Sequence, residues 1–136
     1  KLGVIGIDHR HIIGMLGNMK AQGCHCAHYW TDGPNTTEDK FNHDFPEVAK
    51  VDERRRILED PEVAMVLIAA VPADRAALAI EAMEAGKDVM VDKPGCVTLQ
   101  QLQAIREVQA RTGRIWTVNF SERFEVASMT SHHDPA

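Results

Sequence analysis

Residues 88–95 read Asp-Val-Met-Val-Asp-Lys-Pro-Gly, an apolar run that ends abruptly in an acid, a lysine and a proline. Proline has a fixed φ and no N–H, so a strand over 89–91 must stop before Pro94. In an open α/β sheet, ligands bind just past the carboxyl ends of the strands, which is where Asp92 and Lys93 would lie. The same pattern also describes a solvated Asp-Lys pair before a turn proline. These eight residues alone favour that simpler interpretation.

Segments typical of strands alternate with segments typical of amphipathic helices along the rest of the chain. Strands are expected at residues 2–7, 25–31, 48–51, 65–70, 89–91 and 115–120. Helices are expected at residues 12–22, 54–59, 74–85 and 99–112, and the polar stretch 32–42 is expected to be a loop. The alternation predicts an α/β fold with a doubly wound, mostly parallel sheet and helices on both faces. Right-handed crossovers then place the carboxyl end of every strand on one edge.

The last predicted helix has clear signals at both ends. Thr98 is expected to cap its first turn, with Gln101 completing a capping box, and Gly113 is expected to end it. Leu99 and Ile105 belong to the apolar stripe that should face the sheet.

Composition is that of one soluble globular domain. The chain has 136 residues and a net charge of -5, which gives no electrostatic support for a nucleic acid or an anionic membrane as partner. The longest apolar run, residues 64–72, is too short to span a bilayer, and no secretory signal is visible. The chain does not begin with methionine, so a removed export signal stays open. Three cysteines form no disulfide framework, and a cytoplasmic location is expected.

The first strand-to-helix turn reads Gly-Ile-Asp-His-Arg-His from residue 6. The dinucleotide fingerprint G-x-G-x-x-G needs three glycines here, and only Gly6 fits. Asp8 would bring negative charge close to a pyrophosphate, and His11 replaces a glycine that lets helix and strand pack closely. His9 and Arg10 could donate to phosphate at the helix N-terminus. An ordinary strand-turn-helix with Asp8 as N-cap explains the residues equally well.

An acid that binds the adenine ribose is expected at the end of the second strand. Thr31 and Asp32 are the candidates, directly after Trp30. The alternative, slightly favoured by the residues, is that Asp32 only begins the turn at Gly33-Pro34. Neither interpretation separates NAD from NADP.

The segment Cys24-His25-Cys26 with His28 has residue types that bind metals. Strand alternation sends Cys24, Cys26 and His28 to one face and His25 to the other, and no second ligand pair lies nearby in the sequence. We therefore expect buried strand residues here and predict no metal site.

Residues 65–105, MVLIAAVPADRAALAIEAMEAGKDVMVDKPGCVTLQQLQAI, resemble the Gfo/Idh/MocA oxidoreductases, the group of glucose-fructose oxidoreductase and inositol dehydrogenase. Members typically have an apolar strand, a threonine-proline pair, a helix ending in E-A-G-K and a strand ending in E-K-P. Here Val71-Pro72 stands for the threonine-proline pair, residues 84–87 match, and Asp92-Lys93-Pro94 stands for E-K-P. Residues 118–124 resemble the strand that closes the family's nucleotide domain, so the likeness covers nearly the whole chain.

The resemblance implies a Rossmann-type domain over residues 1–125 that binds NAD or NADP. Residues 126–136 would be a linker or disordered tail toward a C-terminal α+β domain that this chain lacks. Lys93 would position the substrate oxygen beside the nicotinamide, Asp92 would contact the nicotinamide ribose, and Pro72 would line the cofactor site. The Lys93–Pro94 peptide would be cis.

The implied function is an NAD(P)-dependent dehydrogenase that transfers hydride to or from a secondary alcohol of a sugar or cyclitol-like substrate. This chain alone would be inactive, and the parent protein would be a homo-oligomer. The alternative is a dinucleotide-binding regulatory or scaffold module without turnover, which the degraded glycine motif favours and Lys93 disfavours. Substrate identity stays open, because the family's substrate contacts come mostly from the second domain.

Overall fold

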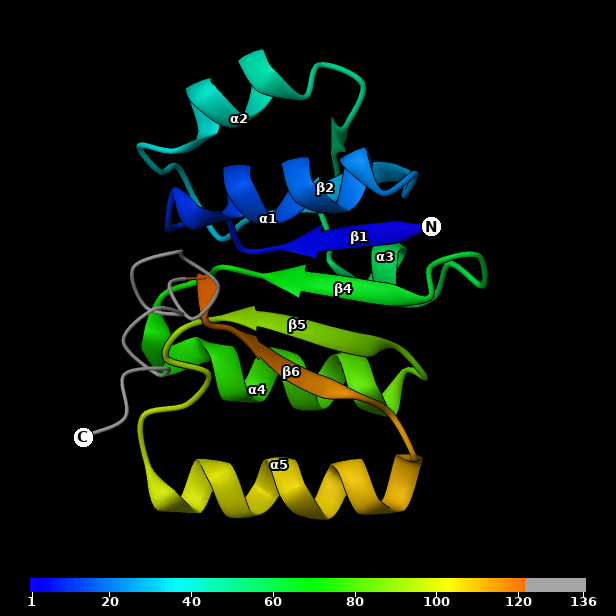
Figure 1. Cartoon of the computed structure of the whole chain (residues 1–136), viewed down its shortest axis with the longest axis vertical. Coiled ribbons are helices and arrows are strands. Elements are labelled where there is room, and N and C mark those ends of the chain that lie inside the picture. The colour runs from blue at the N-terminus through cyan, green and yellow to red at the C-terminus, as the bar shows by residue number, and fades with distance from the viewer. Residues whose placement is uncertain (122–136) are drawn as a thin grey trace, which may run out of the picture.

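One parallel sheet organises the computed structural model, which describes residues 1–121 of the chain (Figure 1). Within these residues its order is β3-β2-β1-β4-β5-β6, and every neighbouring pair is parallel. The order reverses between β1 and β4, which makes the sheet doubly wound, as predicted. The strands are β1 (Leu2–Ile5), β2 (Cys26–Trp30), β3 (Ala49–Lys50), β4 (Met65–Ile68), β5 (Asp88–Asp92) and β6 (Trp116–Asn119).

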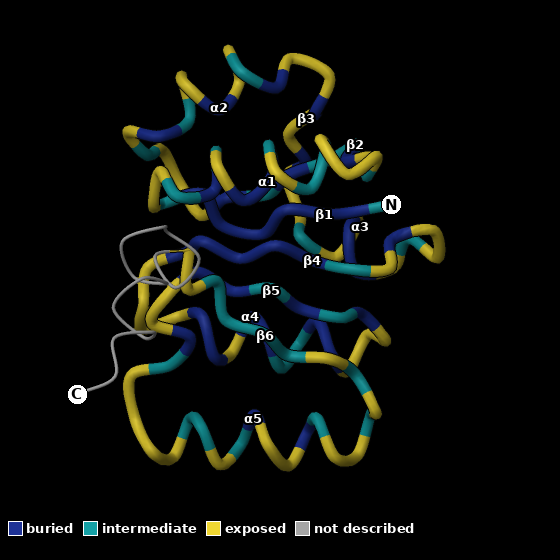
Figure 2. Tube along the Cα trace, viewed as in Figure 1, coloured by how far each residue is buried: buried dark blue, intermediate teal, exposed yellow. Residues whose placement is uncertain are grey.

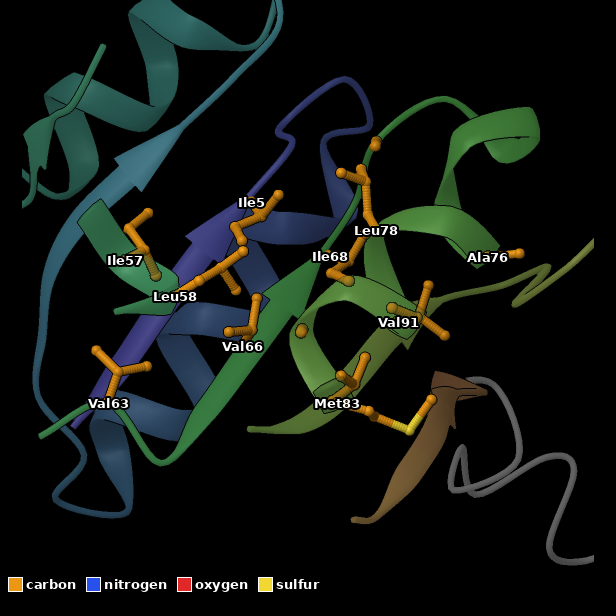
Figure 3. Packing of buried hydrophobic residues seen from close by; sticks show 14 of the residues in the cluster. Ile5, Ile57, Leu58, Val63, Val66, Ile68, Ala76, Leu78, Met83 and Val91 are labelled. Carbon is orange, nitrogen blue, oxygen red and sulfur yellow. The ribbon is translucent and has the colours of Figure 1, made fainter. Parts of the chain in front are cut away.

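Helices cover both faces of the sheet, because the inner strands alternate apolar side chains to either side. Val4 and Leu67 pack in the cluster under α1 and α2, whereas Ile5, Val66 and Ile68 pack in the cluster under α3, α4 and α5. Figure 3 shows the second cluster, and Figure 2 shows that β1 is buried throughout its length. The helices are α1 (His11–Ala21), α2 (Glu38–Asp44), α3 (Arg55–Leu58), α4 (Pro72–Glu84) and α5 (Leu99–Thr112).

Two local predictions, and the alternative with Asp8 as N-cap, are wrong. The predicted loop 32–42 contains the start of α2, because Phe41 is fully buried against Tyr29, with ring centroids 4.8 Å apart. This tertiary contact outweighs the polar composition of the segment. Asp8 is not the N-cap of α1; that position is Arg10, without a capping side chain. Leu99 is 81% exposed, because it lies on the outer side of the first turn of α5.

The predicted ends of α5 are confirmed. The Gln101 N–H donates to the Thr98 hydroxyl at 3.0 Å, and the Gln101 side chain accepts from the Thr98 N–H at 3.3 Å. Gly113 ends the helix with a φ of 68°, a left-handed conformation that favours glycine. Pro72 begins α4 two residues earlier than predicted, at a first-turn position where its missing N–H has no consequence.

Several predictions fall on residues outside the described part of the chain. These are the tail 126–136 and the end of the segment 118–124. Among residues 1–121, none of the helices has the length and apolar character needed to cross a membrane.

Removing the cap of α5 should lower the free energy of unfolding. We expect Thr98→Ala to lose about 1 kcal/mol of unfolding free energy, because the Gln101 N–H in the first turn loses the hydroxyl to which it donates. Gln100→Ala, an exposed change on the same turn, should stay within about 0.5 kcal/mol of the parent. Urea denaturation of both variants tests this, and equal losses would contradict the capping role.

Candidate active site at the carboxyl edge of the sheet

The loops that follow β1 and β4 are joined at the carboxyl edge of the sheet. Figure 1 shows the arrowheads of β1, β4 and β5 pointing to this side. Gly6 has a φ of 82°, and a Cβ there would lie 2.5 Å from the Ala70 Cβ, so the first turn requires glycine. The His9 N–H donates to the Ala69 carbonyl at 3.0 Å, and the Ala69 N–H donates to the Gly6 carbonyl at 3.1 Å. The first turn is therefore held directly against the loop after β4.

The carboxylate of Asp92, at the end of β5, lies at the centre of this edge. It is only 1% exposed. One oxygen accepts from the Lys93 N–H at 2.9 Å and lies 3.0 Å from His11 Nδ1. The other lies 3.4 Å from His9 Nδ1 and 3.5 Å from an Arg75 nitrogen. Partial burial and the neighbouring His11 lower the pKa of His9, against the opposing effect of Asp92.

Arg75 joins the loops that follow β4 and β5. This α4 side chain is 2% exposed. Its guanidinium donates to the carbonyls of Ala70 at 2.7 Å, Asp92 at 3.0 Å and Pro94 at 3.1 Å. Burial lowers the pKa of Arg75, and Asp92 raises it. Since two of the accepting carbonyls flank Lys93, Arg75 fixes the backbone that presents this lysine.

Sequence reasoning missed Arg75 as a site residue. One signal could have found it: an arginine on the core-facing side of an alanine-rich helix needs buried acceptors.

The predicted cis peptide between Lys93 and Pro94 is confirmed.

A pocket of about 270 Å³ lies at the end of β2 and contains Asp8, Trp30, Asp32 and Arg54. The Arg54 guanidinium lies over the Trp30 ring, 5.1 Å from its centroid. A flat aromatic wall with a carboxylate beside it suits a purine and a ribose diol. Thr31 lies outside this pocket: it is buried, and its hydroxyl accepts from the Asn35 amide at 2.8 Å.

A second pocket of about 270 Å³ brings four predicted site residues together. Asp8, His9, Pro72 and Lys93 line it together with Arg75. Asp8 lines both pockets and therefore stands between them. Burial raises the pKa of Asp8, and the nearby acids Asp32 and Asp74 act in the same direction.

The edge fits a dinucleotide better at its two pockets than at the turn between them. The His9 N–H is bound to the Ala69 carbonyl, and the His11 N–H faces His9 Nδ1 at 3.2 Å. These amides are therefore not free for a pyrophosphate, and Asp8 adds negative charge beside it. The turn departs from a usual phosphate-binding turn in both respects.

The expectation of buried strand residues at Cys24–His28 holds only for Cys26: β2 begins there, His25 is exposed before the strand, and Cys24 and His28 are partly buried. Burial raises the pKa of the Cys26 thiol to about 11, and its Sγ lies 3.5 Å from the His28 carbonyl. Over the part of the chain that the structure describes, this segment does not gather three potential metal ligands. Three such groups do meet elsewhere, at His9, His11 and Asp92.

The chain is similar to several known proteins. The family model described as "Oxidoreductase family, NAD-binding Rossmann fold" (GFO_IDH_MocA) matches residues 3–120. The uncharacterized oxidoreductase YdgJ of Escherichia coli K12 is 32% identical over 71% of the chain. The scyllo-inositol 2-dehydrogenase (NAD(+)) of Bacillus subtilis 168 is 35% identical over 52% of it. A crystal structure from Erwinia carotovora atroseptica SCRI1043, assigned as an oxidoreductase, covers 96% of the chain with 31% identity and a TM-score of 0.89.

The chain spans only part of each of these proteins. It covers 28% of the Escherichia coli protein, 21% of the Bacillus subtilis enzyme and 39% of the Erwinia chain.

Replacing Arg75 should strongly destabilise the fold. Arg75→Met leaves the buried Asp92 carboxylate without its guanidinium and three carbonyls without a donor, so we expect a loss on the order of 3–5 kcal/mol in urea denaturation. Arg111→Met removes an exposed arginine that pairs with Glu84 at 2.8 Å and should lose less than about 1 kcal/mol. If Arg75→Met loses no more unfolding free energy than Arg111→Met, Arg75 does not hold the two loops together.

Removing the charge of Asp8 should strengthen nucleotide binding. Two unit charges about 10 Å apart interact by about 1.7 kcal/mol at an effective dielectric constant of 20, so we expect Asp8→Asn to tighten NADH binding on the order of tenfold. Because the pKa of Asp8 is raised, the parent should also bind NADH more tightly as pH falls and this carboxyl becomes protonated. Asp8→Asn should lack that part of the pH dependence. Calorimetry tests both, and unchanged affinity in a folded variant would mean that NADH does not bind at this turn.

Proposed function

The chain belongs to the Gfo/Idh/MocA oxidoreductase family, and we propose that it is the nucleotide-binding part of a dehydrogenase for a secondary alcohol of a sugar or cyclitol-like substrate. The observation that carries this proposal is the position of Lys93. Its side chain is exposed at the carboxyl end of β5, beside the first turn, on a backbone that buried Arg75 fixes. Rossmann-type sheets bind their ligands at this edge.

The cofactor is NAD or NADP, which supplies hydride exchange when bound. We propose that the pocket of Trp30 and Asp32 holds the adenosine, with the Asp32 carboxylate accepting from the ribose hydroxyls. The pocket of His9, Pro72 and Lys93 would face the nicotinamide end. Gly6 allows the turn between the two pockets to lie directly against Ala70, in the loop after β4.

In this proposal Lys93 acts on the substrate oxygen. Its ammonium would donate a hydrogen bond to that oxygen and would stabilise the charge that develops on it. The resemblance assigns Asp92 to the nicotinamide ribose; here its carboxylate is 1% exposed and accepts from the Lys93 N–H at 2.9 Å. Asp92 and Arg75 together would keep Lys93 in a single position relative to the cofactor.

The substrate class rests on one relative. The Bacillus subtilis protein that is 35% identical over 71 residues is named as an inositol dehydrogenase, which supports a cyclitol-like substrate. Residues 1–125 would form the nucleotide-binding domain and residues 126–136 the linker toward a substrate domain. We also propose that the parent protein is a homo-oligomer in the cytoplasm. The cysteines at 24, 26 and 96 are all free thiols, as expected in a reducing compartment.

A second candidate function is a nucleotide-binding module without turnover. The occupied amides of the first turn and the charge of Asp8 favour it, since both weaken a phosphate site. The two functions differ in whether Lys93 matters for turnover. Both expect NADH to bind, so calorimetry alone does not separate them.

Replacing Lys93 in the full-length protein should lower kcat. Lys93→Met removes the charge but keeps a stem of similar length, and we expect a loss on the order of 10²-fold or more. The dissociation constant for NADH should change little, because adenosine binds elsewhere on the edge. Steady-state kinetics with a panel of cyclitols and sugars measures both quantities.

Two further variants complete this experiment. Lys93→Arg should restore little activity, because a guanidinium keeps the charge but does not give up its proton. Lys40→Met removes an exposed lysine that pairs with Asp44 on α2 and should turn over normally. Normal kcat in Lys93→Met, with a substrate that the parent oxidises, would remove Lys93 from the mechanism.

A further inference from the structure

Two histidines and a carboxylate converge at the carboxyl edge of the sheet. His9 and His11 come from the turn after β1, and Asp92 comes from the end of β5. One potential ligand atom from each lies within 4.8 Å of the other two. Among residues 1–121 these side chains form a group that could hold one metal ion, and the sequence did not predict it because His11 and Asp92 are 81 positions apart.

The distances suit a single small ion. Zinc binds histidine nitrogen and carboxylate oxygen at about 2.1 Å, so two ligands of one tetrahedral ion lie about 3.4 Å apart. His9 Nδ1 lies 3.4 Å from one Asp92 oxygen, and His11 Nδ1 lies 3.0 Å from the other. All three ligand atoms lie within 4.8 Å of one another, so small side-chain movements bring them to the separations that coordination requires.

His9 is the ligand that must change its partner. Its Nδ1 accepts from the His11 N–H at 3.2 Å, and an imidazole nitrogen has one lone pair, so an ion bound at Nδ1 would replace this hydrogen bond.

Arg75 leaves the carboxylate available for a second cation. Its three shorter hydrogen bonds, of 2.7 to 3.1 Å, go to main-chain carbonyls. The contact with Asp92 is its longest, at 3.5 Å. Arg75 therefore compensates part of the charge of Asp92 and holds the carboxylate in place, while both oxygens still face the histidines.

We propose that His9, His11 and Asp92 bind one divalent transition metal ion of the zinc type. Two imidazoles and one carboxylate are a ligand set that proteins use for such ions, with at least one coordination position left open. Asp92 is buried, whereas the side chains of His9 and His11 are 47% and 37% exposed, so the open position faces outward. Lys93 and His9 line the same pocket, which places the ion beside the proposed substrate site.

The ion would change the charge balance of the first turn. Asp8 makes this turn unfavourable for a pyrophosphate, and a divalent cation held by His9 and His11 would offset that charge. This consequence rests on the proposed function. The metal site itself does not, because it can be measured without nucleotide.

The test is a calorimetric titration of the purified, metal-free protein with Zn²⁺ in the absence of nucleotide. We expect one ion per chain and a rise in the melting temperature with added Zn²⁺. His9→Gln and His11→Gln should each weaken Zn²⁺ binding at least about tenfold. Replacing a residue that only orients a metal ligand already costs about that much affinity, and replacing a ligand should cost no less. Mg²⁺ should not bind at the same concentration, because it prefers an all-oxygen site.

Two comparisons control for other sites. His43→Gln changes an exposed histidine whose Nδ1 lies 3.1 Å from an Asp44 oxygen. This His-Asp pair resembles that of His11 and Asp92 but has no second histidine. The Zn²⁺ affinity of this variant should therefore equal that of the parent. Cys24→Ala should also leave the affinity unchanged. Retained Zn²⁺ binding in the folded His9→Gln/His11→Gln variant, or no binding to the parent, would overturn the proposal. NADH binding measured without metal tests the proposed function separately.

Discussion

The hydrogen bonds of the buried Arg75 guanidinium are the constraint on which the carboxyl edge depends. A cation that is 2% exposed must have acceptors, and the chain supplies carbonyls from the loops after β4 and β5. These bonds join two loops that the sheet alone would leave to solvent. Because Lys93 lies between two of the accepting carbonyls, the position of the proposed catalytic group follows from the hydrogen bonds of a buried arginine on α4.

Charge determines what this edge can bind. Asp8 and Asp32 line the adenosine pocket, and burial raises the pKa of Asp8. Asp92 adds a third carboxylate, compensated by Arg75 and faced by two imidazoles. An anionic cofactor therefore meets Asp8 and Asp32 at the adenosine pocket, and Asp8 together with the cationic Lys93 at the other pocket.

Sequence patterns predicted the elements but not the contacts between distant ones. The alternation of strands and helices and the cap at Thr98 could be predicted from the sequence, because both depend on residues only a few positions apart. The burial of Phe41 in α2 could not be predicted, because it depends on Tyr29 in strand β2. Lys93 was found from its local motif, whereas Arg75 and the histidine partners of Asp92 became visible only when the sheet brought three loops together.

The central claim is that a dinucleotide lies along this edge, from the pocket of Trp30 to Lys93. Hydrogen–deuterium exchange of the protein with and without saturating NADH tests it most directly. The account predicts slower exchange at the turn after β1, at residues 30–33, and in the loops after β4 and β5. The outer face of α5 should be unchanged. Binding of NADH by calorimetry, with exchange unchanged along the edge or slowed only at α5, would contradict the account.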